Sequence, residues 1–217
     1  MKKQRIRIYF SKTNAMRFTG HLDLILTWER TFRRASLPLS YSEGFSPRPV
    51  LTLAAPLPLG LISTGEIGDF WLSEIMPLAE IQTALQRALP PGLQISNILE
   101  IKDLFGFKLP SLVQAVSYTI ALNTQFPDLE KKVNILLNTQ NLIRERKGKT
   151  YDLRPLVNSL IYSPGNNTRP DELLTTLVTL PGATGRADEI LAALGIPRNQ
   201  ARICRTDIIL KSEGAQT

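Results

Sequence analysis

The chain is 217 residues long, with 43% hydrophobic and 21% charged residues, a composition typical of a globular protein. That length allows one large domain or two domains of about 100 residues each. The single cysteine, Cys204, excludes an intrachain disulfide framework. The charged start of the chain is not followed by an apolar segment, and no stretch reaches the roughly 18 apolar residues of a membrane span. We therefore expect a cytoplasmic protein.

The formal net charge of +7 is concentrated in one part of the chain. Residues 1–60 hold ten basic against three acidic residues, and the rest of the chain is balanced. A local positive field of this kind favours a polyanion as the partner of the first domain, with solubility as the alternative reason for the charge. The ten basic residues are Lys2, Lys3, Arg5, Arg7, Lys12, Arg17, Arg30, Arg33, Arg34 and Arg48.

The first half of the chain predicts six regular elements. Residues 5–10 alternate strictly, which indicates a strand with Ile6, Ile8 and Phe10 on one face. Residues 22–35 have helical spacing, with Thr19 or Gly20 as the N-cap. Gly and Pro punctuation separates the other elements, which are a loop at 39–49, strands at 50–54 and 66–73, a helix at 77–89 and a strand at 93–101. This β-α-β-β-α-β order is the ferredoxin-like arrangement.

A second, looser copy of the same order is predicted after a connection at 102–116. The predicted elements are a strand at 117–122, a helix at 127–137, an extended segment at 142–146, a short helix at 152–161, a strand at 173–180, a helix at 186–194 and a strand at 201–210. The fold class is therefore α+β with two tandem ferredoxin-like halves. The predicted domains are 1–101 and 117–211, followed by a tail at 212–217.

The sequence has neither enough ligands for a zinc or iron–sulfur site nor a motif for binding a nucleotide. Zinc and iron–sulfur sites need three or four Cys or His ligands, and the chain has only Cys204 and His21. A Walker-type phosphate loop is absent, and the Gly-Ala-Thr-Gly run at 182–185 is better explained as a turn. We expect no metal and no cofactor.

His21, the only histidine, stands where the chain enters the predicted helix at 22–35. An imidazole there can act in acid–base chemistry or donate to a phosphate at the helix N-terminus. It can equally be a packing residue of the turn. Because general acid–base catalysis requires a partner group within reach, and the sequence places none, binding or structure is favoured over catalysis.

Basic and aromatic residues alternate after His21. Arg30, Arg33 and Arg34 crowd the end of the predicted helix, where cations suit the helix dipole. Arg30 and Arg34 share a face and repel each other unless an anion lies between them. In the following loop Tyr41, Phe45 and Arg48 interleave rings and charge, as recognition of unpaired RNA requires, although aromatic residues in such loops also serve as lids on a core.

Three spaced motifs resemble the radical SAM-linked protein family. That family has a characteristic Ser-His-Leu-Asp, an Arg-Arg-Ala and a Gly-Phe-Asn-Pro-His-Pro loop. The corresponding runs here are Arg17-Phe18-Thr19-Gly20-His21-Leu22-Asp23-Leu24, Glu29-Arg30-Thr31-Phe32-Arg33-Arg34-Ala35 and Tyr41-Ser42-Glu43-Gly44-Phe45-Ser46-Pro47-Arg48-Pro49. The similarity extends through Leu57-Pro58-Leu59-Gly60 and more weakly to the segments at 152–155 and 203–206. The chain departs from the family at Gly20, at Ser46 and at Arg48-Pro49-Val50, which stands in place of His-Pro-Lys.

The resemblance implies a domain of unknown function that is encoded beside, or fused to, a radical SAM enzyme. It implies no established activity of its own. A radical SAM enzyme needs three cysteine ligands, so this chain would leave that chemistry to its partner. Arg48 in place of a second histidine weakens any two-histidine chemistry and retains a phosphate-binding character.

The leading hypothesis is an accessory protein that binds RNA, such as tRNA or ribosomal RNA, and presents it to a radical SAM enzyme. One alternative is a metal-independent RNA-processing or RNA-modifying enzyme that uses His21 as its catalytic residue. A second is a partner that makes only protein–protein contacts. The candidate residues for binding RNA, phosphate or a partner are Arg17, His21, Asp23, Arg30, Arg33, Arg34, Tyr41, Phe45, Ser46 and Arg48.

Overall fold

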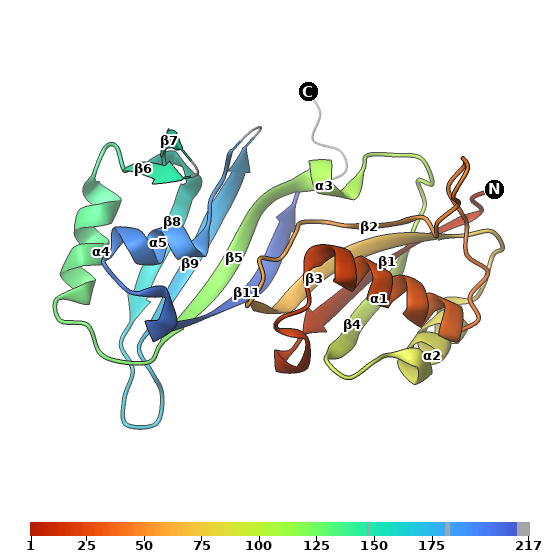
Figure 1. The fold of residues 1–217 in the computed structure, drawn as a ribbon, viewed down its shortest axis with the longest axis horizontal. Coiled ribbons are helices and arrows are strands. Elements are labelled where there is room, and N and C mark those ends of the chain that lie inside the picture. The colour runs from red at the N-terminus through yellow and green to blue at the C-terminus, as the bar shows by residue number, and fades with distance from the viewer. Residues whose placement is uncertain (147, 181–182, 212–217) are drawn as a thin grey trace. The chain divides into compact units, whose positions relative to one another are not determined.

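The computed structural model describes residues 1–146, 148–180 and 183–211, and these residues form two compact units (Figure 1). Unit 1 comprises Met1–Val113 and unit 2 comprises Gln114–Lys211. Both are mixed α and β structures with antiparallel strand pairing, as the sequence predicts at the level of fold class. Residues 102–113, which include most of the predicted connection, lie with unit 1. The predicted tail at 212–217 is outside the described residues.

Unit 1 contains the predicted β-α-β-β-α-β order. Its strands lie side by side in the order β2-β3-β1-β4, and each pair is antiparallel. A 3-10 turn, η1, precedes the first long helix and a short helix, α3, follows the last strand. The elements are β1 (Gln4–Lys12), η1 (Asn14–Met16), α1 (His21–Arg34), β2 (Leu51–Leu53), β3 (Ile62–Leu72), α2 (Leu78–Ala88), β4 (Leu93–Ile101) and α3 (Leu109–Leu112).

Strand β1 carries the core of unit 1 on its apolar face. Ile6, Ile8 and Phe10 are fully buried there, in the cluster that also takes the inward side chains of α1 and α2. Phe10, Trp28, Phe32 and Phe70 form a continuous aromatic row, with ring centroids 4.9, 5.4 and 4.4 Å apart in that order. Aromatic pairs at such separations add to the stabilisation from burial alone. The row fixes α1 on the sheet.

The other face of β1 buries charge, which the sequence did not predict. Arg5 and Arg7 are 2% and 5% exposed, and both guanidinium groups bind the carboxylate of Asp69, which is fully buried on β3. Lys12 is also buried. These three cations lie away from solvent, so the predicted positive field depends on the remaining seven basic residues of the 1–60 segment. Burial is possible for the arginines because ion pairing and hydrogen bonds offset their desolvation.

The turn after α2 packs closely against the 3-10 turn η1. Gly92 has φ +96°, and a Cβ placed on it would lie 2.8 Å from the Met16 side chain. The Gly92 carbonyl accepts a hydrogen bond from the Thr13 amide at 2.9 Å. Only glycine meets both conditions, because φ is positive and the space for a side chain is already filled.

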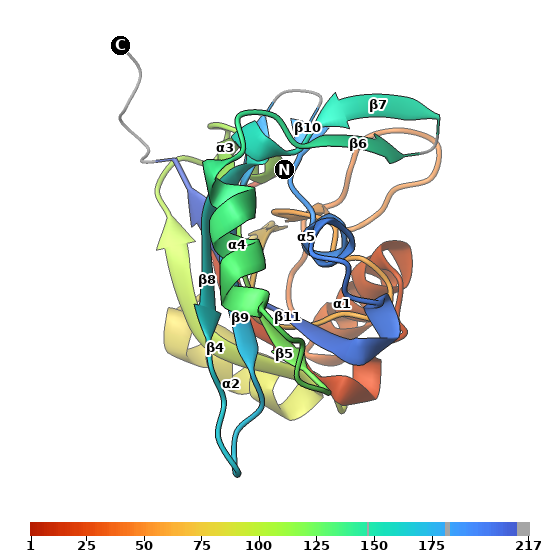
Figure 2. The ribbon, with the colours of Figure 1, turned by 90° about the vertical axis from the view of Figure 1, so that its left-hand side faces the viewer.

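Unit 2 has the strand order β10-β9-β5-β11, with β8 also paired to β9. A separate β6–β7 hairpin lies beside helix α5, because Arg144 on β6 contacts Glu189 in the first turn of α5 at 3.3 Å (Figure 2). The elements are β5 (Val113–Leu122), α4 (Leu129–Asn138), β6 (Ile143–Arg146), β7 (Lys149–Asp152), η2 (Arg154–Leu156), β8 (Val157–Ser163), β9 (Glu172–Leu180), β10 (Ala183–Thr184), α5 (Ala187–Ala193), η3 (Arg198–Gln200) and β11 (Ala201–Leu210).

One predicted element of unit 2 is wrong. The sequence predicts a short helix at 152–161, but the structure has the 3-10 turn η2 followed by strand β8. Pro155 fits the start of a short helical turn, and the following residues pair with β9 from Val157 to Ser163. Pairing with the next strand of the chain, β9, therefore decides the conformation of this segment. Among the described residues of both units, no helix has the length and apolar character needed to cross a membrane.

Candidate nucleic-acid interface

The predicted site residues occupy three places in unit 1. Arg17, His21 and Asp23 lie at the start of α1, Arg30, Arg33 and Arg34 at its end, and Tyr41, Phe45, Ser46 and Arg48 in the 41–49 loop. A helix of 14 residues is about 20 Å long at 1.5 Å per residue. The two ends of α1 are therefore separate surfaces.

The start of α1 already carries its own negative group. Gly20 is the N-cap and makes no side-chain cap, and the Asp23 carboxylate would lie 3.3 Å from a Cβ placed on Gly20. A carboxylate in the first turn suits the helix dipole and competes with a phosphate for the same position. The Nδ1 atom of His21 is buried. Arg17 donates to the Gly60 carbonyl at 2.8 Å and lies over the Phe18 ring.

At the other end of α1, the three arginines have different surroundings. Arg33 is 3.9 Å from the Glu29 carboxylate, one turn earlier. The Arg30 side chain is exposed and makes no hydrogen bond or ion pair with another described residue. Of the three, Arg30 is therefore the most available to a phosphate.

Arg34 joins the ends of the two long helices of unit 1. Its Nη2 atom donates to the Ala88 carbonyl at 2.9 Å and to the Thr31 hydroxyl at 3.3 Å. This contact covers a carbonyl at the C-terminal end of α2, where the helix dipole is negative. Arg34 thus has a structural role that sequence reasoning missed, and the predicted sharing of an anion with Arg30 stays a prediction.

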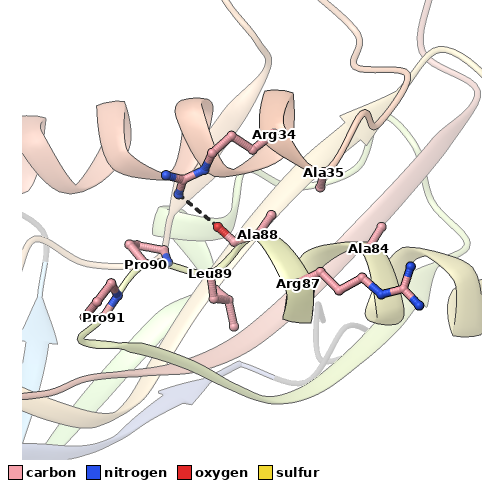
Figure 3. A pocket seen from close by; sticks show the side chains of 8 residues that line it. All are labelled: Arg34, Ala35, Ala84, Arg87, Ala88, Leu89, Pro90 and Pro91. Atoms are coloured by element: carbon pink, nitrogen blue, oxygen red, sulfur yellow. Dashed lines mark hydrogen bonds between the residues drawn. The ribbon is translucent and has the colours of Figure 1, made fainter.

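A hollow of about 670 Å³ lies beside this contact (Figure 3). Arg87, which sequence reasoning missed, also lines the hollow. Arg87 lies in the last turn of α2, and Arg34 lies in the last turn of α1. The two guanidinium groups point in opposite directions, so they do not converge on one ligand. The hollow is lined by Arg34, Ala35, Ala84, Arg87, Ala88, Leu89, Pro90 and Pro91, none of them acidic.

The 41–49 loop projects from the sheet on a closed base. Tyr41 forms a bridge with Pro49, the Ser42 amide donates to the Arg48 carbonyl at 2.8 Å, and the Arg48 amide donates to the Ser42 hydroxyl at 3.1 Å. The Phe45 ring is fully exposed, and Ser46 and Arg48 of the same loop are also exposed. A loop closed at its base by hydrogen bonds thus exposes both an aromatic ring and a cation to solvent.

The structure does not bring His21 and Phe45 together. Arg17, near His21, bonds to Gly60 just before β3, whereas the 41–49 loop begins where Ser40 bonds to Trp71 near the end of β3. At about 3.3 Å per residue, the 11 residues of β3 separate these points by roughly 30 Å. Among the described residues, no group of three or more His, Cys, Asp or Glu side chains is placed to hold a metal ion.

Sequence reasoning also missed Phe105 and Phe107, in the segment predicted as a connection. Both rings are exposed, and Lys102 and Lys108 flank them. The same interleaving of rings and basic residues that marks the 41–49 loop was a signal available in the sequence.

A family model described as "Uncharacterized protein conserved in bacteria (DUF2344)" matches residues 5–186. No curated protein matches the chain. A chain of a structure titled "Crystal Structure of a Cbf5-Nop10-Gar1 Complex" is 11% identical with a TM-score of 0.49, over 96% of this chain and 50% of that one. The chain thus spans half the length of that protein. The acetolactate synthase small subunit from Thermotoga maritima is 11% identical with a TM-score of 0.26, over 95% of both chains. Similarities this weak assign neither fold nor function.

Proposed function

We propose that this chain, which belongs to the DUF2344 family, is an RNA-binding accessory protein of a radical SAM enzyme. The observation that carries the RNA part is the fully exposed Phe45 ring in a loop closed by hydrogen bonds, which also exposes Arg48 three residues later. Exposing a phenylalanine costs free energy unless a partner covers it. An unpaired base can stack on the ring while a guanidinium binds the adjacent phosphate.

Charge in the rest of unit 1 supports a polyanionic partner. Of the ten basic residues in the 1–60 segment, seven remain wholly or partly exposed, whereas of its three acidic residues Glu29 is buried. Contacts between such basic side chains and phosphates would position an RNA without reading its sequence. The module would therefore hold unpaired RNA of many sequences.

We further infer that the two units are tandem ferredoxin-like halves. The order β2-β3-β1-β4 in unit 1 corresponds to β8-β9-β5-β11 in unit 2, with one helix after the first strand and one before the last in each. In this interpretation the β6–β7 hairpin and β10 are additions to the second half. The exposed ring and arginines described above belong to the first half alone.

The radical SAM partner rests on the resemblance of the Gly20-His21-Leu22-Asp23, Arg33-Arg34-Ala35 and 44–49 motifs to the radical SAM-linked family. With one cysteine, this chain has too few thiolates for a four-iron cluster. Mixing the purified protein with a purified radical SAM enzyme from the same genome should give a complex that elutes earlier on size exclusion than either component. Separate elution at micromolar concentrations would remove the partner from the proposal.

Replacing Phe45 with Ala is expected to weaken binding of an unstructured RNA of about 12 nucleotides by roughly 5- to 150-fold, because one stacked base contributes about 1 to 3 kcal/mol. Fluorescence anisotropy with labelled RNA measures the change. Ile135→Ala, which removes an exposed apolar side chain from α4 in unit 2, is the matched control and should leave the affinity unchanged. Equal RNA affinities of the wild type and Phe45→Ala would show that no base stacks on Phe45.

Replacing Arg30 and Arg48 with Gln is expected to flatten the dependence of log affinity on log salt by ~0.7 for each phosphate that the variant no longer neutralises. Arg34 is kept, because its bond to Ala88 would confound binding with stability. Lys131→Gln/Lys132→Gln, which removes two exposed cations of unit 2, is the charge-matched control. An unchanged slope, or a wild-type protein that binds no RNA at low salt, would favour a surface for a protein partner.

A further inference from the structure

The 102–108 segment is a loop that the sheet of unit 1 holds in place. Arg5 donates from Nη1 to the Asp103 carbonyl and from Nη2 to the Phe107 carbonyl, each at 3.1 Å. The indole nitrogen of Trp71 donates to the Leu104 carbonyl at 2.9 Å. Within the loop, the Phe105 amide donates to the Asp103 carboxylate at 3.0 Å. Three backbone carbonyls of this short loop are therefore held by two side chains of the sheet.

The anchor itself is rigid. The guanidinium of Arg5 binds Asp69 through Nε at 3.0 Å and Nη2 at 2.6 Å, and both side chains are buried. A planar guanidinium fixed on one side by a carboxylate presents its remaining donors in a set direction. The loop is thus ordered before any partner arrives, which lowers the entropic cost of binding.

This ordered loop presents aromatic rings to solvent among lysines. Phe105 is 76% exposed and Phe107 is 53% exposed. The Lys2 ammonium lies 4.7 Å from the centroid of Trp71 and 5.9 Å from that of Phe105. Lys102 and Lys108 are exposed and contact no other described residue through an ion pair.

Two carboxylates in or beside the loop accept hydrogen bonds from neutral amides, which leave their negative charge in place. That of Asp103 accepts the Phe105 amide, and that of Glu100 accepts from the Gln4 side chain at 3.0 Å. Lys2, Lys102 and Lys108 outnumber these two carboxylates, so an occupant complementary to the surface carries negative charge and flat apolar groups. Unpaired nucleic acid has both, as alternating phosphates and bases.

One residue joins this loop to the 41–49 loop. The Trp71 amide donates to the Val50 carbonyl at 3.2 Å and the Trp71 carbonyl accepts the Ser40 amide at 2.8 Å, so the backbone of Trp71 holds the base of the 41–49 loop. Its side chain holds Leu104. Both aromatic loops therefore start from the same end of β3.

We propose that the 102–108 loop is a second stacking site for unpaired RNA, where bases stack on Phe105 and Phe107 and where Lys2, Lys102 and Lys108 bind the phosphates. The inference rests on the proposed RNA binding and extends it to one continuous strand. In this proposal a single RNA strand runs from Phe45 to Phe105 past the end of β3.

The test compares Phe105→Ala/Phe107→Ala with the wild type in binding an unstructured RNA of about 12 nucleotides. We expect the affinity to fall by roughly 5- to 150-fold for each base that loses its ring. Both rings are exposed, so circular dichroism should show an unchanged fold. In RNA carrying 4-thiouridine, ultraviolet light should crosslink the wild-type protein within 102–108. Ile135→Ala, with its exposed side chain on α4, again serves as the control.

Two results would overturn the proposal: one leaves the proposed RNA binding at Phe45 in place, and the other rejects RNA binding altogether. If the wild type and Phe45→Ala behave as expected but Phe105→Ala/Phe107→Ala binds like the wild type and no crosslink falls within 102–108, only the second site is lost. If the wild type binds no RNA at low salt, the proposed function fails and takes this site with it.

Discussion

Asp69→Asn is expected to lower the free energy of unfolding of unit 1 by about 3 to 5 kcal/mol. The substitution preserves the shape of the side chain but leaves Arg5 and Arg7 buried without their shared anion. Both bonds are short, at 2.6 and 2.8 Å, and neither arginine is more than 6% exposed at its side chain. Solvent therefore cannot screen the two remaining positive charges.

Guanidinium-induced unfolding followed by tryptophan fluorescence measures this loss. Both tryptophans of the chain, Trp28 and Trp71, lie in unit 1, so the signal reports on that unit. Glu80→Gln is the control, because the same loss of a carboxylate charge then acts on an exposed side chain in the first turn of α2, also in unit 1, where a charge contributes at most about 1 kcal/mol. Similar losses in the two variants would contradict the argument from burial.

Phe32→Ala is expected to cost about 3 to 5 kcal/mol of the same free energy. Phe32 is fully buried in the middle of the aromatic row, between Trp28 at 5.4 Å and Phe70 at 4.4 Å. Truncation removes the packing of the ring against both neighbours and leaves a cavity that rigid side chains cannot fill. Thermal and denaturant unfolding of the two proteins give the difference.

Trp28→Phe provides the comparison for this prediction. The indole nitrogen of Trp28 is buried and has no hydrogen-bond partner among the described residues, and an unsatisfied buried donor costs about 1 to 3 kcal/mol. The variant removes that donor and keeps a ring in the row. We therefore expect a smaller loss than in Phe32→Ala, and a larger loss would mean that the volume of the indole outweighs its unsatisfied donor.

Local patterns in the sequence were sufficient for most elements of unit 1. The alternation in residues 5–10 and the helical spacing after His21 each depend on which side chains face the core, and β1 and α1 lie where these patterns place them. The segment at 152–161 shows the limit. Its conformation depends on pairing with β9, and the spacing of residues within 152–161 does not itself report that a strand will pair with them.

The same limit explains what could be predicted of the candidate site. The exposure of the Phe45 ring did not follow from sequence, because aromatic residues in such loops also serve as lids on a core; only the loop itself, with its Gly and Pro, could be predicted. The burial of Arg5 and Arg7 could not, because Asp69 lies more than 60 residues away. Counting charges along the chain treats buried and exposed cations alike, whereas a phosphate meets only the exposed ones.

The contact between Gly92 and Met16 limits how this sequence can change during evolution. Any side chain at position 92 would meet Met16 and would also require a positive φ, so two penalties act on a single substitution. A smaller residue at 16 would relieve only the first of them. We therefore expect homologous chains with this fold to retain glycine here even where the neighbouring prolines have been replaced, which makes position 92 a marker for aligning distant members.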